Sequence, residues 1–145
     1  MTENEKWEYI NELDEELLLG GVTLSEWTTF LVKDAETAFC YGAYLSSILA
    51  CQAAIESHLR YDYFNPLETK GWSFFDLIEK ACLMPELKIE LHELRKFRNK
   101  WVHINDPSND DDLLERPNYY QMELELFSKK TIKTMLKLIY LNPLI

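Results

Sequence analysis

Three polar residues near the end of a basic helical segment have the types and spacing of a site for RNA chemistry. Arg98, Asn99 and His103 occur in the segment ELRKFRNKWVHIND, residues 93–106. The His103 imidazole can act as general base on a ribose 2′-hydroxyl or as general acid on the leaving 5′-oxygen. The Arg98 guanidinium can stabilise charge developing on phosphorus, and the Asn99 amide can hold the imidazole or the phosphate. This chemistry requires no metal ion or other cofactor, but it does require the 2′-hydroxyl that DNA lacks.

Further basic residues surround this group and offer diffuse attraction for RNA phosphates. Arg95, Lys96 and Lys100 lie on the same helical segment, and such cations raise affinity for RNA without reading its sequence. Successive residues of an ideal helix are 100° apart, so Arg98 and His103 point about 140° away from each other. One chain therefore presents the two groups awkwardly to a shared substrate. Two symmetry-related copies would bring a pair of each around one groove, which predicts a composite site at a homodimer interface.

Simpler interpretations of the same residues remain open. Cationic side chains near the C-terminus of a helix stabilise its dipole, and Arg98 and His103 fit this role. Glu56 lies in CQAAIESHL, a helical segment rich in small residues. A buried carboxylate there would need a partner, for which Arg98 and His103 are candidates. The alternative is that Glu56 faces solvent.

The overall charge argues against a simple cationic nucleic-acid binder, because the 145 residues carry a net charge of −10. This charge is unevenly distributed. Residues 1–26 have a net charge of −7 and residues 104–116 of −4, whereas residues 86–105 have +2 and residues 126–145 have +4. An acidic protein with this distribution can still present a basic face. An apolar content of 47% supplies a hydrophobic core, and the length fits a single domain over residues 1–145.

The cysteines and the N-terminal residues indicate the cellular compartment of the protein. Cys40, Cys51 and Cys82 form no Cys-x-x-Cys pair and are odd in number. We expect all three to be small buried hydrophobic residues in a reducing compartment. The first residues are acidic, so they do not resemble a signal peptide, and no apolar run approaches the length of a membrane span. The expectation is a cytoplasmic protein that is not inserted into a membrane.

Apolar residues recur at helical spacing through most of the chain, and no segment alternates for long enough to predict a strand. Gly42 is a candidate kink, but we favour one long helix through it. Residues 1–22 contain an acidic N-terminal helix, and residues 104–117 form an acidic loop. The predicted fold is an all-α bundle of about five helices. These helices cover residues 4–19, 25–62, 74–83, 85–102 and 118–140.

Local signals place the beginnings of several helices. Thr23 or Ser25 can cap the long second helix, and Ser73 can cap the short third one. Pro85 suits the first turn of the fourth helix, because proline lacks the amide hydrogen that this position does not use.

The segment RNKWVH resembles the Arg-x4-6-His signature of HEPN domains (higher eukaryotes and prokaryotes nucleotide-binding), with Arg98, Asn99 and His103 at the motif positions. The flanking LHELRKFRNKWVH is similar to the penultimate helix of the family. CQAAIESHL, with Glu56, is similar to its long helix, and FFDLIEKA is similar to the short helix between them. The resemblance covers most of residues 28–140. It implies a helical bundle with two long antiparallel helices, dimerisation and metal-independent endoribonuclease activity, often in toxin–antitoxin or antiviral systems.

Under this resemblance, the expected catalytic residues are Arg98 and His103, and Asn99 and Glu56 support them. The expected partners are single-stranded RNA, a second copy of the chain and an antitoxin or other protein. Two other hypotheses remain: a catalytically silent HEPN-like module that binds RNA or protein, and a helical adaptor without a nucleic-acid role.

Overall fold

The protein is an all-α bundle, as the sequence predicts. The structure is a computed structural model, and it describes residues 1–102 and 113–141. Over these two ranges it contains six α-helices, one π-helical segment and no strand. None of these helices combines the length and the apolar character needed to cross a membrane. The elements are α1 (Glu3–Leu17), α2 (Glu26–Cys40), α3 (Tyr44–Ser57), η1 (His58–Tyr63), α4 (Phe74–Lys80), α5 (Pro85–Val102) and α6 (Pro117–Ile139).

Side-chain caps fix the beginnings of several helices, and two of them are predicted caps. The Ser25 hydroxyl accepts a hydrogen bond from the Thr28 amide and caps α2. Ser73 and Asp76 form a reciprocal capping box at α4, in which each side chain accepts from the other residue's amide. Pro85 is the first residue of α5, as expected. These bonds satisfy amide hydrogens that a helix start leaves without intrahelical partners.

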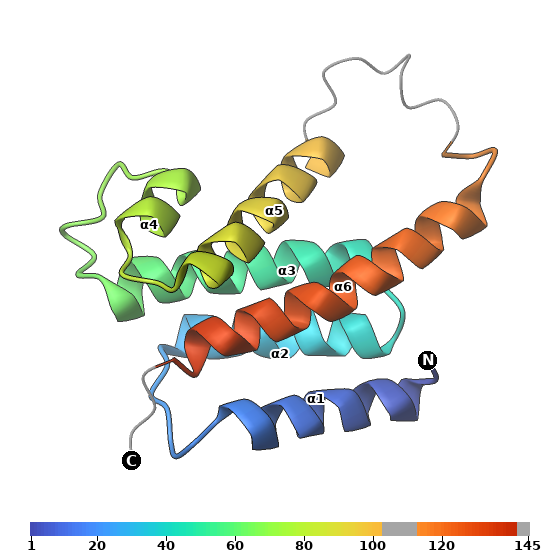
Figure 1. Cartoon of the computed structure of the whole chain (residues 1–145), viewed down its shortest axis with the longest axis horizontal. Helices are drawn as coiled ribbons and strands as arrows, with labels where there is room; N and C mark the ends of the chain where they lie inside the picture. The colour runs from blue at the N-terminus through green and yellow to red at the C-terminus, as the bar shows by residue number, and fades with distance from the viewer. Residues whose placement is uncertain (103–112, 142–145) are drawn as a thin grey trace.

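The predicted single helix over residues 25–62 is wrong. The chain reverses at Gly42, whose φ of 85° lies in the left-handed region that glycine adopts without a side-chain clash. Next to it, the Ala43 amide donates to the Ala38 carbonyl at 2.8 Å and closes the end of α2. α3 then runs back beside α2 (Figure 1), which gives six α-helices in the described residues rather than about five.

The hydrophobic core is shared by all six α-helices, and α3 and α6 pass through its middle (Figure 1). The expectation that all three cysteines are buried is wrong for Cys82, which is exposed, while Cys40 and Cys51 are buried. Trp27 of α2 is 68% exposed although it is a large apolar residue. The largest fully buried side chains are Ile10, Phe39, Ile48, Ile55, Leu59, Leu77, Ile78, Leu91, Leu94, Ile132, Met135 and Leu136.

α5 carries the predicted motif, and its packing against α6 fixes its position. The rings of Phe97 and Phe127 stack with their centroids 3.9 Å apart. One turn further along α5, the Trp101 ring meets Tyr120 edge-on at 6.3 Å. Stacked aromatic pairs add about 0.5–1.5 kcal/mol beyond the area they bury. The last turns of α5 are therefore held by aromatic contacts on one side, which leaves Arg98 on another side of the helix.

Candidate functional site

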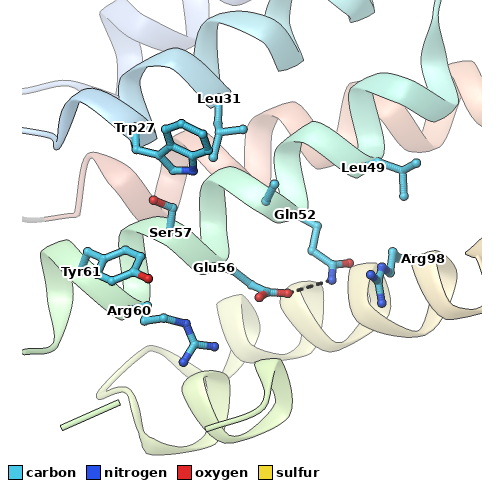
Figure 2. Close-up of a pocket in the computed structure, with 10 residues that line it drawn as sticks. Trp27, Leu31, Leu49, Gln52, Glu56, Ser57, Arg60, Tyr61 and Arg98 are labelled. Atoms are coloured by element: carbon cyan, nitrogen blue, oxygen red, sulfur yellow. Dashed lines mark hydrogen bonds between the residues drawn. The ribbon is translucent and has the colours of Figure 1, made fainter. Parts of the chain in front are cut away.

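A groove of about 600 Å³ lies between α2, α3, η1 and the C-terminal half of α5. This volume is in the range of small-molecule sites. Figure 2 shows side chains from all four elements around it. Its lining mixes aromatic, aliphatic, amide, acidic and basic groups. The lining residues are Trp27, Leu31, Leu49, Gln52, Ala53, Glu56, Ser57, Arg60, Tyr61 and Arg98.

Two predicted site residues, Arg98 and Glu56, line this same groove although they are 42 positions apart in the sequence. Arg98 is half-buried on α5, and its Nη1 donates to Oδ1 of Asn99 at a long 3.4 Å. Within the described ranges this is the only polar contact of the Arg98 guanidinium, so most of its N–H groups are free to donate. Arg98 and Glu56 thus face one groove without neutralising each other.

Glu56 has a different partner from the ones the sequence suggested. Its Oε1 accepts a hydrogen bond from Nε2 of Gln52, one helical turn earlier, at 3.2 Å. Within residues 1–102 and 113–141, Glu56 forms no ion pair with Arg98 or any other cation. Its other oxygen, Oε2, is therefore an open acceptor on the groove wall.

Gln52 carries a buried polar atom without a hydrogen-bond partner. It is only 4% exposed, and its Oε1 is buried without a hydrogen-bond partner among the described residues. The bond from Nε2 to Glu56 fixes which way the amide faces, because the flipped amide would set two acceptors against each other. In Figure 2 this oxygen points to the side on which Arg98 lies. A buried acceptor without a donor costs about 1–3 kcal/mol, so its presence calls for an explanation.

Aromatic rings form one end of the groove. Trp27 of α2 is 68% exposed and Tyr61 of η1 is 53% exposed. Arg60, which precedes Tyr61 in η1, is engaged within the fold, because its guanidinium donates to the carbonyls of Thr69 and Trp72 at 2.9 Å each. Arg98 is therefore the groove cation whose donors are available, and Trp27 and Tyr61 offer flat apolar faces to a ligand.

The predicted RNA-binding residues do not gather at this groove. Arg95 and Lys96 line a separate hollow of about 450 Å³ beside α4. There the Arg95 guanidinium lies over the Phe75 ring at 5.3 Å, and its Nε donates to Nδ1 of His92 at 3.3 Å. His92 in turn contacts Glu79 at 2.6 Å. This hollow has its own carboxylates and does not extend the cationic surface around Arg98.

Of the other predicted site residues, Lys100 and Asn99 do not line the groove in the described part of the chain. Lys100 is exposed in the last turn of α5, and Asn99 is half-buried beside Arg98. His103 lies outside the described residues, and so does most of the predicted acidic loop. The predicted angle between Arg98 and His103 therefore stays a prediction. In the described part of the chain, no three His, Cys, Asp or Glu side chains lie close enough together to hold a metal ion.

Sequence reasoning missed Gln52, Trp27 and Tyr61 as groove residues. Gln52 and Glu56 are four residues apart on a helix, a spacing at which an amide and a carboxylate can pair. Their hydrogen bond could therefore have been predicted from the sequence. The contributions of Trp27 and Tyr61 depend on how α2 and η1 lie against α5, which no local pattern specifies.

Comparison with protein-family models, curated proteins and solved structures finds no match to this chain.

Proposed function

We propose that this protein is a HEPN-like, metal-independent endoribonuclease that cleaves single-stranded RNA at a site shared between two copies of the chain, as a toxin or antiviral effector. The observation that carries the proposal is the convergence of Arg98 and Glu56 on one groove. The HEPN resemblance assigns these residues to one site, and they come from helices that are distant in the sequence. The groove also leaves the donors of Arg98 free for a phosphate, as the proposed chemistry requires.

The proposed reaction uses groups of this chain only. The imidazole of His103 removes the proton of the ribose 2′-hydroxyl, and the 2′-oxygen attacks phosphorus. The bond from phosphorus to the 5′-oxygen breaks, and the leaving oxygen takes a proton from a second, protonated imidazole. The products are a 2′,3′-cyclic phosphate and a 5′-hydroxyl. Arg98 donates to the non-bridging oxygens, whose charge grows in the transition state. Asn99, whose Oδ1 accepts from Arg98, holds the guanidinium in place.

A homodimer supplies the second imidazole in this proposal. The angle of about 140° between Arg98 and His103 on an ideal helix motivates it, because one chain alone would aim the two groups apart. A two-fold axis near the end of α5 brings Arg98 of each copy toward His103 of the other. Light scattering is expected to give the mass of a dimer, and a strict monomer at tens of micromolar would contradict this part of the proposal.

The test of the activity uses labelled RNA in EDTA with wild type, His103→Ala and Arg98→Lys. We expect His103→Ala to lose roughly 100- to 10,000-fold in rate, the usual contribution of a general acid or base. Arg98→Lys is also expected to fail, because an ammonium group lacks the planar fork of guanidinium. Equal cleavage by all three proteins would place the activity elsewhere, and absence of cleavage by wild type across varied RNAs would refute the ribonuclease proposal.

Mixing wild type with an equal amount of His103→Ala tests the shared site. If each site needs the imidazoles of both chains, the heterodimer is inactive, and random exchange of subunits leaves about one quarter of the activity of the same amount of wild type. If each chain builds its own site, about one half of that activity remains. Circular dichroism of each variant checks that the fold is intact.

A second candidate function is a catalytically silent module that binds RNA or a protein partner. The observation in its favour is the Glu56 carboxylate on the groove wall, which pairs with no cation in the described residues and opposes a scissile phosphate beside it. RNA binding without cleavage by the wild-type protein would support this function. A protein that neither binds nor cleaves RNA would leave the helical-adaptor hypothesis.

A further inference from the structure

We infer that the groove binds a guanine base, with Glu56 as the residue that recognises it and Gln52 as the residue that positions the Glu56 carboxylate. This inference rests on the proposed ribonuclease function, because it names the base that the site selects in its RNA. It depends only on residues of α2, α3, η1 and α5 that the structure describes.

The hydrogen-bonding groups of the groove wall define the ligand. Glu56 Oε2 is an open acceptor on the groove wall, and Oε1, which accepts from Nε2 of Gln52, keeps a second lone pair. Figure 2 shows this bond from the Gln52 amide, which holds the carboxylate in place. A ligand that uses both oxygens of the carboxylate needs adjacent N–H donors. Across the groove, Arg98 supplies donors, so the same ligand needs an acceptor beyond its donors.

Among the four RNA bases, only guanine has this arrangement on one edge. Its Watson–Crick edge places the N1–H and N2–H₂ donors next to each other, and the O6 acceptor beside them. Adenine and cytosine each have one amino donor next to acceptors and no second N–H beside it. Uracil has one N–H between two carbonyls. Glu56 can accept from N1–H and N2–H together, as carboxylates accept from paired donors. Arg98 can donate to O6 or to the adjoining phosphate.

The rest of the lining suits a flat base. Trp27 and Tyr61 expose ring faces at the end of the groove, and stacking on aromatic side chains is a common way for proteins to hold an unpaired base. A lysine or arginine of a peptide would also satisfy the acceptors. The cations Arg60 and Arg98 on the same groove oppose a ligand of that charge.

The test is titration calorimetry of the whole protein at low salt with the 5′-monophosphates of guanosine, inosine, adenosine, cytidine and uridine. We expect guanosine monophosphate to bind roughly 5- to 150-fold more tightly than adenosine monophosphate, the discrimination of one good pair of hydrogen bonds. Inosine lacks only the N2 amino group, so it is expected to bind between the two. Similar affinity for all five nucleotides, or no binding of any, would overturn the inference. The inosine comparison needs no variant.

Glu56→Gln is the matched variant, because an amide of the same size replaces one acceptor oxygen by a donor. It is expected to bring the preference for guanosine over adenosine to within about two-fold. Glu12→Gln makes the same change on the exposed face of α1 and is expected to keep the wild-type preference. A guanosine preference that survives in Glu56→Gln would contradict the assignment.

Cleavage mapping separates this inference from the proposed function. Cleavage that needs His103 but occurs equally beside all four bases would overturn the guanine inference and leave the ribonuclease proposal standing. Guanosine binding that needs Glu56, in a protein that cuts no RNA, would refute the ribonuclease proposal and support the guanine inference.

Discussion

Removing the charge of Glu36 is expected to stabilise the protein at alkaline pH. Glu36 of α2 is largely buried and has no hydrogen-bond partner within the described ranges. Burial, and secondly the nearby Asp14 carboxylate of α1, raise the pKa of Glu36 from its ordinary 4.5 to about 7. The Asp14 Oδ1 is itself engaged by the Tyr140 hydroxyl at 2.7 Å, at the end of α6. Burial of Glu36 therefore packs one carboxylate close to another.

The pKa difference sets both the direction and the pH window of the effect. Between pH 4.5 and pH 7 the folded state holds a proton on Glu36 that the unfolded state has released. The free energy of unfolding therefore falls as pH rises through this window and levels off above it. The full difference corresponds to about 3 kcal/mol, and the residual solvent contact of the side chain reduces it to roughly 1–3 kcal/mol.

Glu36→Gln keeps the shape of the side chain and removes this penalty. We expect the variant to melt about 3–10 °C above wild type at pH 8, since each kcal/mol shifts the melting temperature of a chain of this length by about 2–4 °C. At pH 4.5 the two proteins are expected to melt together. Thermal melting followed by circular dichroism at both pH values is the assay. The exposed Glu12→Gln is the control and is expected to show no pH-dependent gain. Equal melting of Glu36→Gln and wild type at pH 8 would refute the reasoning.

Two further predictions concern the α2–α3 turn and the RNA surface. Gly42→Ala is expected to lower the free energy of unfolding by about 1–2 kcal/mol, as measured by thermal melting. Backbone strain alone causes this loss, because an added Cβ meets nothing within 4 Å. Gly42→Asn is expected to lose less, and an unchanged melting temperature for Gly42→Ala would contradict the prediction. For RNA binding by the His103→Ala protein, Arg98→Gln is expected to reduce the slope of log affinity against log salt by about 0.7, the contribution of one phosphate contact on a single strand. Arg95→Gln, in the separate hollow, is expected to leave that slope unchanged, and an equal effect of both variants would contradict the separation of the two surfaces.

Local signals were enough to predict the helical class and several helix beginnings. Ser25, Ser73 and Pro85 act through contacts within one turn, and the chain near them specifies those contacts completely. The reversal at Gly42 was not predictable in the same way. A glycine inside a helix costs only about 1 kcal/mol relative to alanine, so the sequence leaves both outcomes open. The packing of α3 back onto α2 and α6 decides between them.

The candidate site shows a similar division. Arg98 and Glu56 were predicted together through the resemblance, and they do line one groove. Arg95 is only three residues from Arg98, and helical spacing alone would group the two. Phe75 of α4 draws the Arg95 guanidinium into a separate hollow instead. A third element therefore separated two cations that the periodicity of α5 places near each other.

The small residues of α3 account for both the core and the groove. Cys51 and Ala54 are fully buried, and their size allows α3 to lie close to its neighbours in the core. Ala53 points the other way, is exposed and lies in the groove, where a larger side chain would occupy the space. Gln52 and Glu56 flank this space on the same helix, and the hydrogen bond from Gln52 fixes the Glu56 carboxylate before any ligand arrives. A site prepared in this way loses little conformational entropy on binding, which favours selective recognition of a base over diffuse attraction to phosphates.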